Sequence, residues 1–185
     1  MESKEYIQLA LVTESNDFKA IRERLSSPSL QKDLIESLAK MDEVTKKLDL
    51  LKKQIFYGKL PPGHVSETDK TAELVFDSST IDDKTIRLLH ATIGVASESG
   101  EIVEALSKGL KAGKLDEVNF AEEVGDIFWY LAIASSALQV TFSTIWKINI
   151  KKLAKRFGGK FSEFFAQNRQ LEKEREILEE IQNSK

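Results

Sequence analysis

The spacing of the apolar residues constrains the fold of this chain most. Along nearly the whole sequence they recur at every third or fourth position, and nowhere do they alternate with polar residues for long. A spacing of three and four puts apolar side chains on one face of an α-helix, whereas alternation would indicate a β-strand. The sequence therefore predicts an all-α protein, a helical bundle without a sheet.

Breaks in this spacing divide the chain into helices. Serine, glycine and proline residues, which cap or end helices, fall between the apolar segments. We expect helices at about 3–13, 17–25, 29–57, 82–110, 116–140 and 142–157, and a last one that begins at Ser162 and becomes charge-dense. The polar residues 63–81 are interpreted as a linker, and the charged end as a solvated or partner-facing tail.

The long helix near the N-terminus carries one apolar stripe that needs a partner surface. The stripe consists of Leu34, Leu38, Met41, Val44, Leu48, Leu51 and Ile55. The end of this helix, Lys53-x4-Gly58-Lys59-Leu60, is repeated 55 residues later as Lys108-x4-Gly113-Lys114-Leu115. Coincidence between lysine-rich helices explains the repeat most simply, and a degenerate duplication stays open as the alternative.

Composition excludes several classes of protein. The chain has no cysteine, so zinc ribbons, iron–sulfur clusters and cysteine nucleophiles are excluded. Its net charge is −3, from 27 basic and 30 acidic residues, so no overall field attracts it to nucleic acid or to an anionic membrane. We therefore expect no stable nucleic-acid binding and no membrane binding, and we expect a cytoplasmic location.

One uncharged segment, residues 127–146, is long enough at 20 residues to cross a bilayer. Serine, threonine and glutamine residues interrupt its centre and its C-terminal half. We interpret this segment as a buried helix of the bundle rather than as a transmembrane helix.

Two pairs of acidic residues carry the main chemical signal. Glu98 and Glu101 are three residues apart on one expected helix, and Glu123 and Asp126 are three apart on the next. This spacing puts each pair on one helical face. Each pair stands in apolar sequence beside a glycine, Gly100 or Gly125, where backbones can approach closely.

Carboxylates in apolar surroundings are costly unless a cation neutralises them. Four of them supply the oxygen ligands that Mg²⁺ or Mn²⁺ prefers. The simpler alternative is a solvated acidic face. Di-iron centres use Glu-x-x-His pairs, and neither histidine, His64 or His90, stands three residues after a glutamate.

A basic segment suggests an anion site. Between Lys147 and Lys160 the chain has six basic residues and no acidic one. Asn149, Lys152 and Arg156 share one helical face there, which could bind phosphate or could simply be solvated.

Aromatic and imidazole side chains stand beside the acids. Trp129 and Tyr130 directly follow the second acid pair, and His90 shares a stripe with Glu98. The two aromatic side chains could stack on a base or could be core residues. His90 could contact a nucleotide or could be a hydrogen-bonded structural histidine.

The acid motifs resemble those of the MazG-like all-α nucleoside triphosphate pyrophosphohydrolases. Glu98-Ser-Gly-Glu101, then Glu123-Val-Gly-Asp126 followed by Ile-Phe-Trp-Tyr-Leu-Ala, is similar to the family's ExxE…ExxD signature. Two flanking motifs resemble the phage-encoded members, namely Arg87-Leu-Leu-His90-Ala and Asn149-x-x-Lys152-Leu-x-x-Arg156-Phe. The family often has a second acid at the start of the first motif, and this chain has Ser97 there.

The resemblance implies a domain organisation and an activity. It divides the chain into N-terminal helices with an inserted long helix at 1–81, a catalytic helical domain at 82–169 and a charged tail at 170–185. It implies Mg²⁺-dependent cleavage of a (deoxy)nucleoside triphosphate into the monophosphate and pyrophosphate, with Mn²⁺ as a substitute, in a homodimer or homotetramer. For a phage-encoded protein the compartment would be the host cytoplasm.

The resemblance also implies roles for single residues. Glu98, Glu101, Glu123 and Asp126 would bind the metal, and Glu98 or Glu101 would help to take a proton from the attacking water. Asn149, Lys152, Arg156, His90 and Tyr130 would bind the substrate. The alternatives are a catalytically silent nucleotide-binding protein of the same fold and a helical interaction protein whose acids are incidental.

Overall fold

The computed structural model describes residues 1–59 and 77–181, which form eight α-helices, one 3₁₀ helix and no strand. The predicted all-α class is confirmed. The helices are α1 (Ser3–Leu11), α2 (Phe18–Leu25), α3 (Pro28–Tyr57), α4 (Asp83–Ala112), α5 (Glu117–Leu138), α6 (Phe142–Phe157), α7 (Glu163–Gln167) and α8 (Leu171–Glu179), with the 3₁₀ helix at Ser78–Thr80. Residues 63–76 of the predicted linker lie outside the described residues.

The chain forms two compact units. One contains residues 27–137, and the other combines residues 1–26 with the chain from residue 138 onward. These units group the residues differently from the division into 1–81, 82–169 and 170–185. That division follows the family resemblance and stays a prediction.

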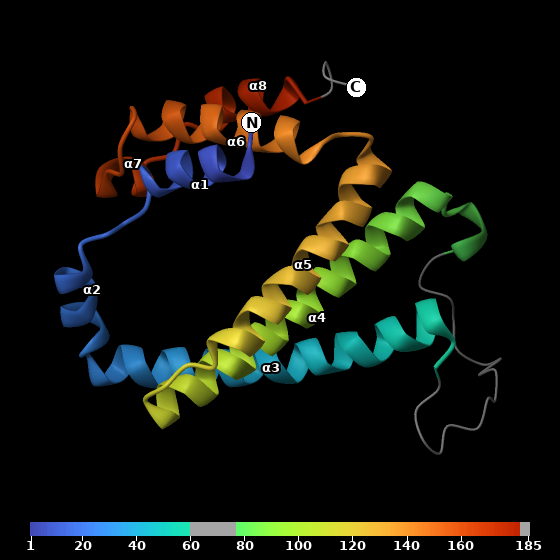
Figure 1. The fold of residues 1–185 in the computed structure, drawn as a ribbon, viewed down its shortest axis with the longest axis horizontal. Coiled ribbons are helices and arrows are strands. Elements are labelled where there is room, and N and C mark those ends of the chain that lie inside the picture. The colour runs from blue at the N-terminus through green and yellow to red at the C-terminus, as the bar shows by residue number, and fades with distance from the viewer. Residues whose placement is uncertain (60–76, 182–185) are drawn as a thin grey trace. The chain divides into compact units, whose positions relative to one another are not determined.

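The first unit contains α3, α4 and nearly all of α5 (Figure 1). The α4 helix is capped at its C-terminus by Gly113, whose φ of 71° is easy for glycine, and α5 then returns along α4 (Figure 1). Two glycines of α4 let its neighbours approach closely. A methyl group on Gly94 would collide with the Tyr130 ring of α5, and one on Gly100 would collide with the Thr45 side chain of α3. We expected a close approach of another backbone at Gly125 as well, but nothing lies within 4 Å of a methyl group placed there.

The α3 helix turns a polar face, not its apolar stripe, toward α4. Thr45 and Lys52 are its buried residues, at 6% and 4% exposure, whereas Val44 and Ile55 of the predicted stripe are 59% and 58% exposed. Within one chain the stripe is therefore covered only in part, at the half-buried Leu38 and Leu48. The physical reason is that α4 offers buried polar groups, Ser97 and Glu98, which the polar face of α3 satisfies.

The uncharged segment 127–146 is divided between α5 and α6 by a break at residues 139–141, where Gln139 has a φ of 58°. Only one side of α5 is buried, and Phe128 and Trp129 are 49% and 55% exposed, so the expected buried helix is half exposed in the single chain. No single helix among the described residues is long and apolar enough to cross a membrane. The α5 and α6 helices meet that criterion only when they are counted together across their break.

The second unit is built around α6, which contacts α1, α7 and α8. Val140, Ile148 and Phe157 are its buried apolar side chains. Ser162 caps α7 as predicted, but the expected single last helix is two, because the chain leaves the helical conformation at Asn168. The charged tail is also not wholly solvated, because Glu174 of α8 is only 3% exposed.

Candidate metal centre

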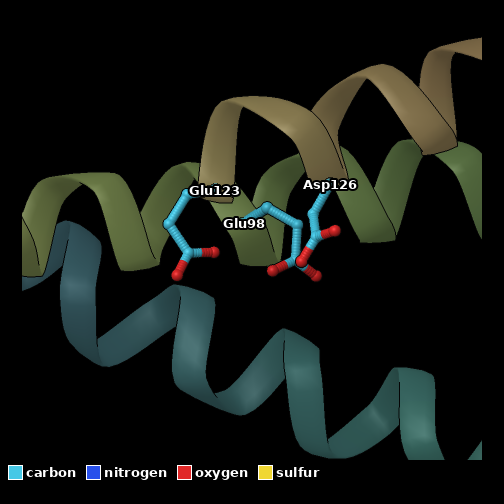
Figure 2. A group of neighbouring side chains, drawn as sticks. All are labelled: Glu98, Glu123 and Asp126. Carbon is cyan, nitrogen blue, oxygen red and sulfur yellow. The ribbon is translucent and has the colours of Figure 1, made fainter. Parts of the chain in front are cut away.

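Three of the four predicted acids converge in the first unit. Glu98 of α4 and Glu123 and Asp126 of α5 each offer one carboxylate oxygen, and these oxygens lie within 4.8 Å of one another (Figure 2). The three-residue spacing puts Glu123 and Asp126 on the same face of α5, and the α4–α5 hairpin brings that face to Glu98. The donor set consists of oxygen alone, which suits a hard divalent cation such as Mg²⁺ or Mn²⁺.

The acids destabilise one another electrostatically. Glu98 and Glu123 are 7% and 6% exposed. Burial, with the nearby charges of Glu101, Glu98 and Asp126, raises the pKa of Glu123 to about 7. A bound cation would relieve both the burial cost and the repulsion, so the residues present fit a divalent metal.

Glu101 lies outside this group of three. It is exposed on α4 and lines a cavity of about 300 Å³ between α3 and α4, together with Asp42, Thr45, Asp49 and Glu104 among others. Burial and the charges of Glu98 and Asp49 raise the pKa of its carboxyl group. Its roles as metal ligand and as proton acceptor stay predictions.

A lysine of α3 that was not predicted from the sequence, Lys52, reaches the acids. The Lys52 Nζ donates to Glu98 Oε1 at 2.8 Å and to Ser97 Oγ at 2.8 Å, and lies 3.1 Å from Asp49 Oδ1. Burial alone would lower the pKa of Lys52, but hydrogen bonds to Glu98, Tyr130 and Asp49 outweigh it and leave that pKa raised.

Little in the sequence marks Lys52 as different from its neighbours. Lys46, Lys47 and Lys53 stand on the same helix, and only the fold shows which lysine is buried. The i, i+3 spacing of Asp49 and Lys52 was the available signal, and it is common on solvated helices.

Ser97 occupies the position where the family often has another acid. Its hydroxyl group accepts a hydrogen bond from Lys52 and lies 2.9 Å from the Gly94 carbonyl oxygen, to which it donates. This position therefore adds no negative charge and instead contacts a cation of the same chain.

His90 lies in a group of aromatic rings beside the acids. Its imidazole stacks on Phe56 with centroids 4.1 Å apart, and Tyr57, Trp129 and Tyr130 approach it edge-on. Burial and the charge of Lys52 lower the pKa of His90, which favours the neutral imidazole. Tyr130 is 6% exposed and Trp129 is 55% exposed, so Trp129 is the ring more open to a ligand.

The predicted phosphate-binding residues lie on α6, in the other compact unit. Asn149, Lys152 and Arg156 are half-buried there. Arg156 Nε donates to Glu174 Oε1 at 2.8 Å, so its guanidinium already has a carboxylate partner. Burial, then the charge of Arg156, lowers the pKa of Lys152. Phosphate binding by this face stays a prediction.

Comparison with known proteins supports the resemblance. Residues 88–159 match the MazG nucleotide pyrophosphohydrolase domain, a range that includes all four predicted acids. The Gene 37 protein of Mycobacterium phage L5 is 35% identical over 74 residues, which cover 37% of this chain and 65% of that protein. The chain thus spans just under two thirds of this relative. No solved structure matches significantly. The resemblance to the MazG-like family is confirmed for this segment.

Proposed function

We propose that the MazG nucleotide pyrophosphohydrolase domain at residues 88–159 makes this chain a Mg²⁺-dependent enzyme that hydrolyses a nucleoside triphosphate. Water would be consumed, the bond between the α- and β-phosphoryl groups would break, and the nucleoside monophosphate and pyrophosphate would be released. The convergence of Glu98, Glu123 and Asp126 carries this proposal, because Glu123 is buried among neighbouring acids, and its charge is costly without a cation beside it.

Glu98, Glu123 and Asp126 would hold the metal, and Glu101 would be a fourth ligand. When bound, Mg²⁺ would neutralise phosphate charge and activate a water molecule. Glu101 is a suitable proton acceptor, because its pKa is raised and its side chain is more exposed than Glu98 and Glu123. Glu98 is less suited to that role, because its Oε1 atom already accepts a hydrogen bond from Lys52.

The substrate would bind through chemistry of two kinds. The exposed Trp129 ring, beside His90 and Tyr130, supports stacking on a nucleobase. Asn149, Lys152 and Arg156 would contact the phosphates. For Arg156 this requires that Glu174 share or release the guanidinium. The cytoplasm, of the host if the protein is phage-encoded, is the proposed compartment.

The direct test is product analysis. The chain is incubated with a panel of ribo- and deoxyribonucleoside triphosphates and Mg²⁺, and products are followed by ³¹P NMR, with EDTA as the metal-free control. We expect monophosphate and pyrophosphate with Mg²⁺ and no turnover with EDTA. Asp126→Asn should abolish turnover. Glu122→Gln is the matched control, because Glu122 is an exposed acid on the same helix outside the converging group.

The alternative functions predict different results. Mg²⁺-dependent nucleotide binding without any product would favour a catalytically silent binding protein. Absence of both binding and turnover across the panel would favour a helical interaction protein. Release of orthophosphate alone would contradict the proposed bond cleavage.

We also propose that the active form is a homo-oligomer. Five of the seven residues of the α3 stripe, all but Leu38 and Leu48, stay exposed in one chain, as does Phe128 of α5. Exposed apolar surface of this extent is typical of an interface. Sedimentation at assay concentration should show a dimer or tetramer, and a fully active monomer would contradict the proposal.

A further inference from the structure

The ammonium group of Lys52 has a full set of partners within its own chain. Its three donors are shared among Ser97 Oγ and Glu98 Oε1 at 2.8 Å each, Asp49 Oδ1 at 3.1 Å and the hydroxyl group of Tyr130. The side chain is 5% exposed, and Nζ lies 5.1 Å from the centre of the Tyr130 ring. An ammonium group with every donor in use is poorly placed to bind a phosphate of the substrate.

The same group places a fixed positive charge at the proposed metal centre. Glu98 belongs to the converging group of acids and is also the carboxylate that Lys52 contacts most closely. A cation that binds to Glu98 therefore meets a second cation already bound to the same carboxylate. Like charges a few ångströms apart at a partly buried site repel strongly enough to change affinity by more than tenfold. Asp49 offsets part of this repulsion.

We propose that Lys52 is the resident counter-cation of the acidic cluster. It stabilises Glu98 in the metal-free chain and weakens metal binding when no nucleotide is present. Since a triphosphate brings four negative charges of its own, the site would then bind the metal mainly together with its substrate. This inference rests on the proposed function, because it assumes that the three acids bind a divalent cation.

The experiment titrates the full-length chain with Mn²⁺, without nucleotide and at pH 8, by calorimetry. Lys52→Met removes the charge, and Lys52→Gln removes it but keeps a hydrogen-bond donor. Both should bind Mn²⁺ about tenfold more tightly than the wild type. Lys52→Arg keeps the charge and should stay within about twofold of the wild-type affinity. Lys53→Met is the matched control, because Lys53 is the next residue, its one ion pair within residues 1–59 and 77–181 is with Asp49, and its side chain is 40% exposed.

A second readout is thermal stability, measured with and without the metal. In EDTA the melting temperature of Lys52→Met should fall, because Glu98 loses its cation, and saturating Mn²⁺ should close much of the gap to the wild type. If Lys52→Met does not fold by circular dichroism, Lys52→Gln carries the test alone.

The outcomes separate the two levels of inference. If the wild type binds Mn²⁺ and the uncharged variants bind it equally or more weakly, Lys52 is not a competing cation, and the metal centre stands without it. If neither the wild type nor any variant binds Mn²⁺ or is stabilised by it, the metal centre fails and this inference fails with it.

Discussion

Two buried glutamates of this chain, Glu123 of α5 and Glu174 of α8, behave in opposite ways. They are 6% and 3% exposed, so burial alone would penalise both ionised carboxylates. Burial and four surrounding acids raise the pKa of Glu123 to about 7, whereas hydrogen bonds from Arg156 and Arg169 lower the pKa of Glu174 to about 2. The partners of a carboxylate, rather than its depth, therefore decide whether it is a structural ion pair or a site that needs a cation.

The largest expected effect comes from neutralising each glutamate in turn. Glu174→Gln should lower the free energy of unfolding by about 3 kcal/mol, because two guanidinium groups lose their buried partner. Glu123→Gln should not destabilise the metal-free chain, since it relieves repulsion, but it should abolish stabilisation by Mg²⁺. Thermal unfolding with EDTA and with Mg²⁺ measures both. A loss of stability in EDTA for Glu123→Gln equal to that for Glu174→Gln would remove the contrast.

The pH dependence of stability should separate the two residues further. With its pKa lowered to about 2, Glu174 stabilises the fold above its ordinary pKa of 4.5, and this stabilisation is lost as pH falls toward 2. Glu123 has the opposite sign: with its pKa raised to about 7, metal-free stability falls as pH rises from 4.5 through 7. Each shift corresponds to about 3 kcal/mol at most.

Denaturant unfolding in EDTA between pH 3 and pH 8 measures this dependence. The wild type should be most stable in mild acid. Glu123→Gln should remove the decline toward neutral pH, and Glu174→Gln should remove much of the acid loss. If the stability of the wild type in EDTA instead rises steadily up to pH 8, the pKa of Glu123 is not raised in the folded chain.

The smallest expected effect tests whether charge, rather than helix geometry, governs the acid cluster. Gly125 lies between Glu123 and Asp126, and a methyl group there meets nothing within 4 Å. Gly125→Ala should raise the stability by up to about 1 kcal/mol through helix propensity alone. Metal binding should be unchanged. Weaker Mn²⁺ binding by this variant in calorimetry would show that the acids depend on a feature of the backbone at this position.

The sequence was enough to predict the helices, because the apolar spacing and the capping residues are local signals. The spacing of three also pointed to the acids Glu98, Glu123 and Asp126, which converge, but it equally pointed to Glu101, which lies outside that group. The sequence could not predict the rotation of α3, which depends on which neighbour satisfies Ser97 and Glu98. Because this rotation was unknown, the sequence indicated neither which face of α3 is buried nor that Lys52 lies on that face.

The rotation of α3, which the sequence could not predict, also makes the surroundings of Glu98 and Glu123 different. The sequence spacing alone predicts that Glu98 and Glu123 are repelled equally by the other carboxylates. In the structure Glu98 has a buried ammonium partner, and among the described residues no hydrogen bond or ion pair from a basic side chain reaches Glu123. Relief of repulsion in the metal-free chain is therefore expected for Glu123→Gln and not for Glu98→Gln.

Gly100 sets the register of α3 against α4. The Thr45 side chain fills the space that a Cβ atom at Gly100 would occupy, and its hydroxyl group donates to the carbonyl oxygens of Met41 and Asp42, which fixes its rotamer. A slip of one helical turn would carry α3 about 5.4 Å along its axis and take the Lys52 ammonium out of reach of Glu98. The lack of a side chain at Gly100 thus fixes the position of Thr45 on α3, and with it the position of the Lys52 charge seven residues further along the same helix.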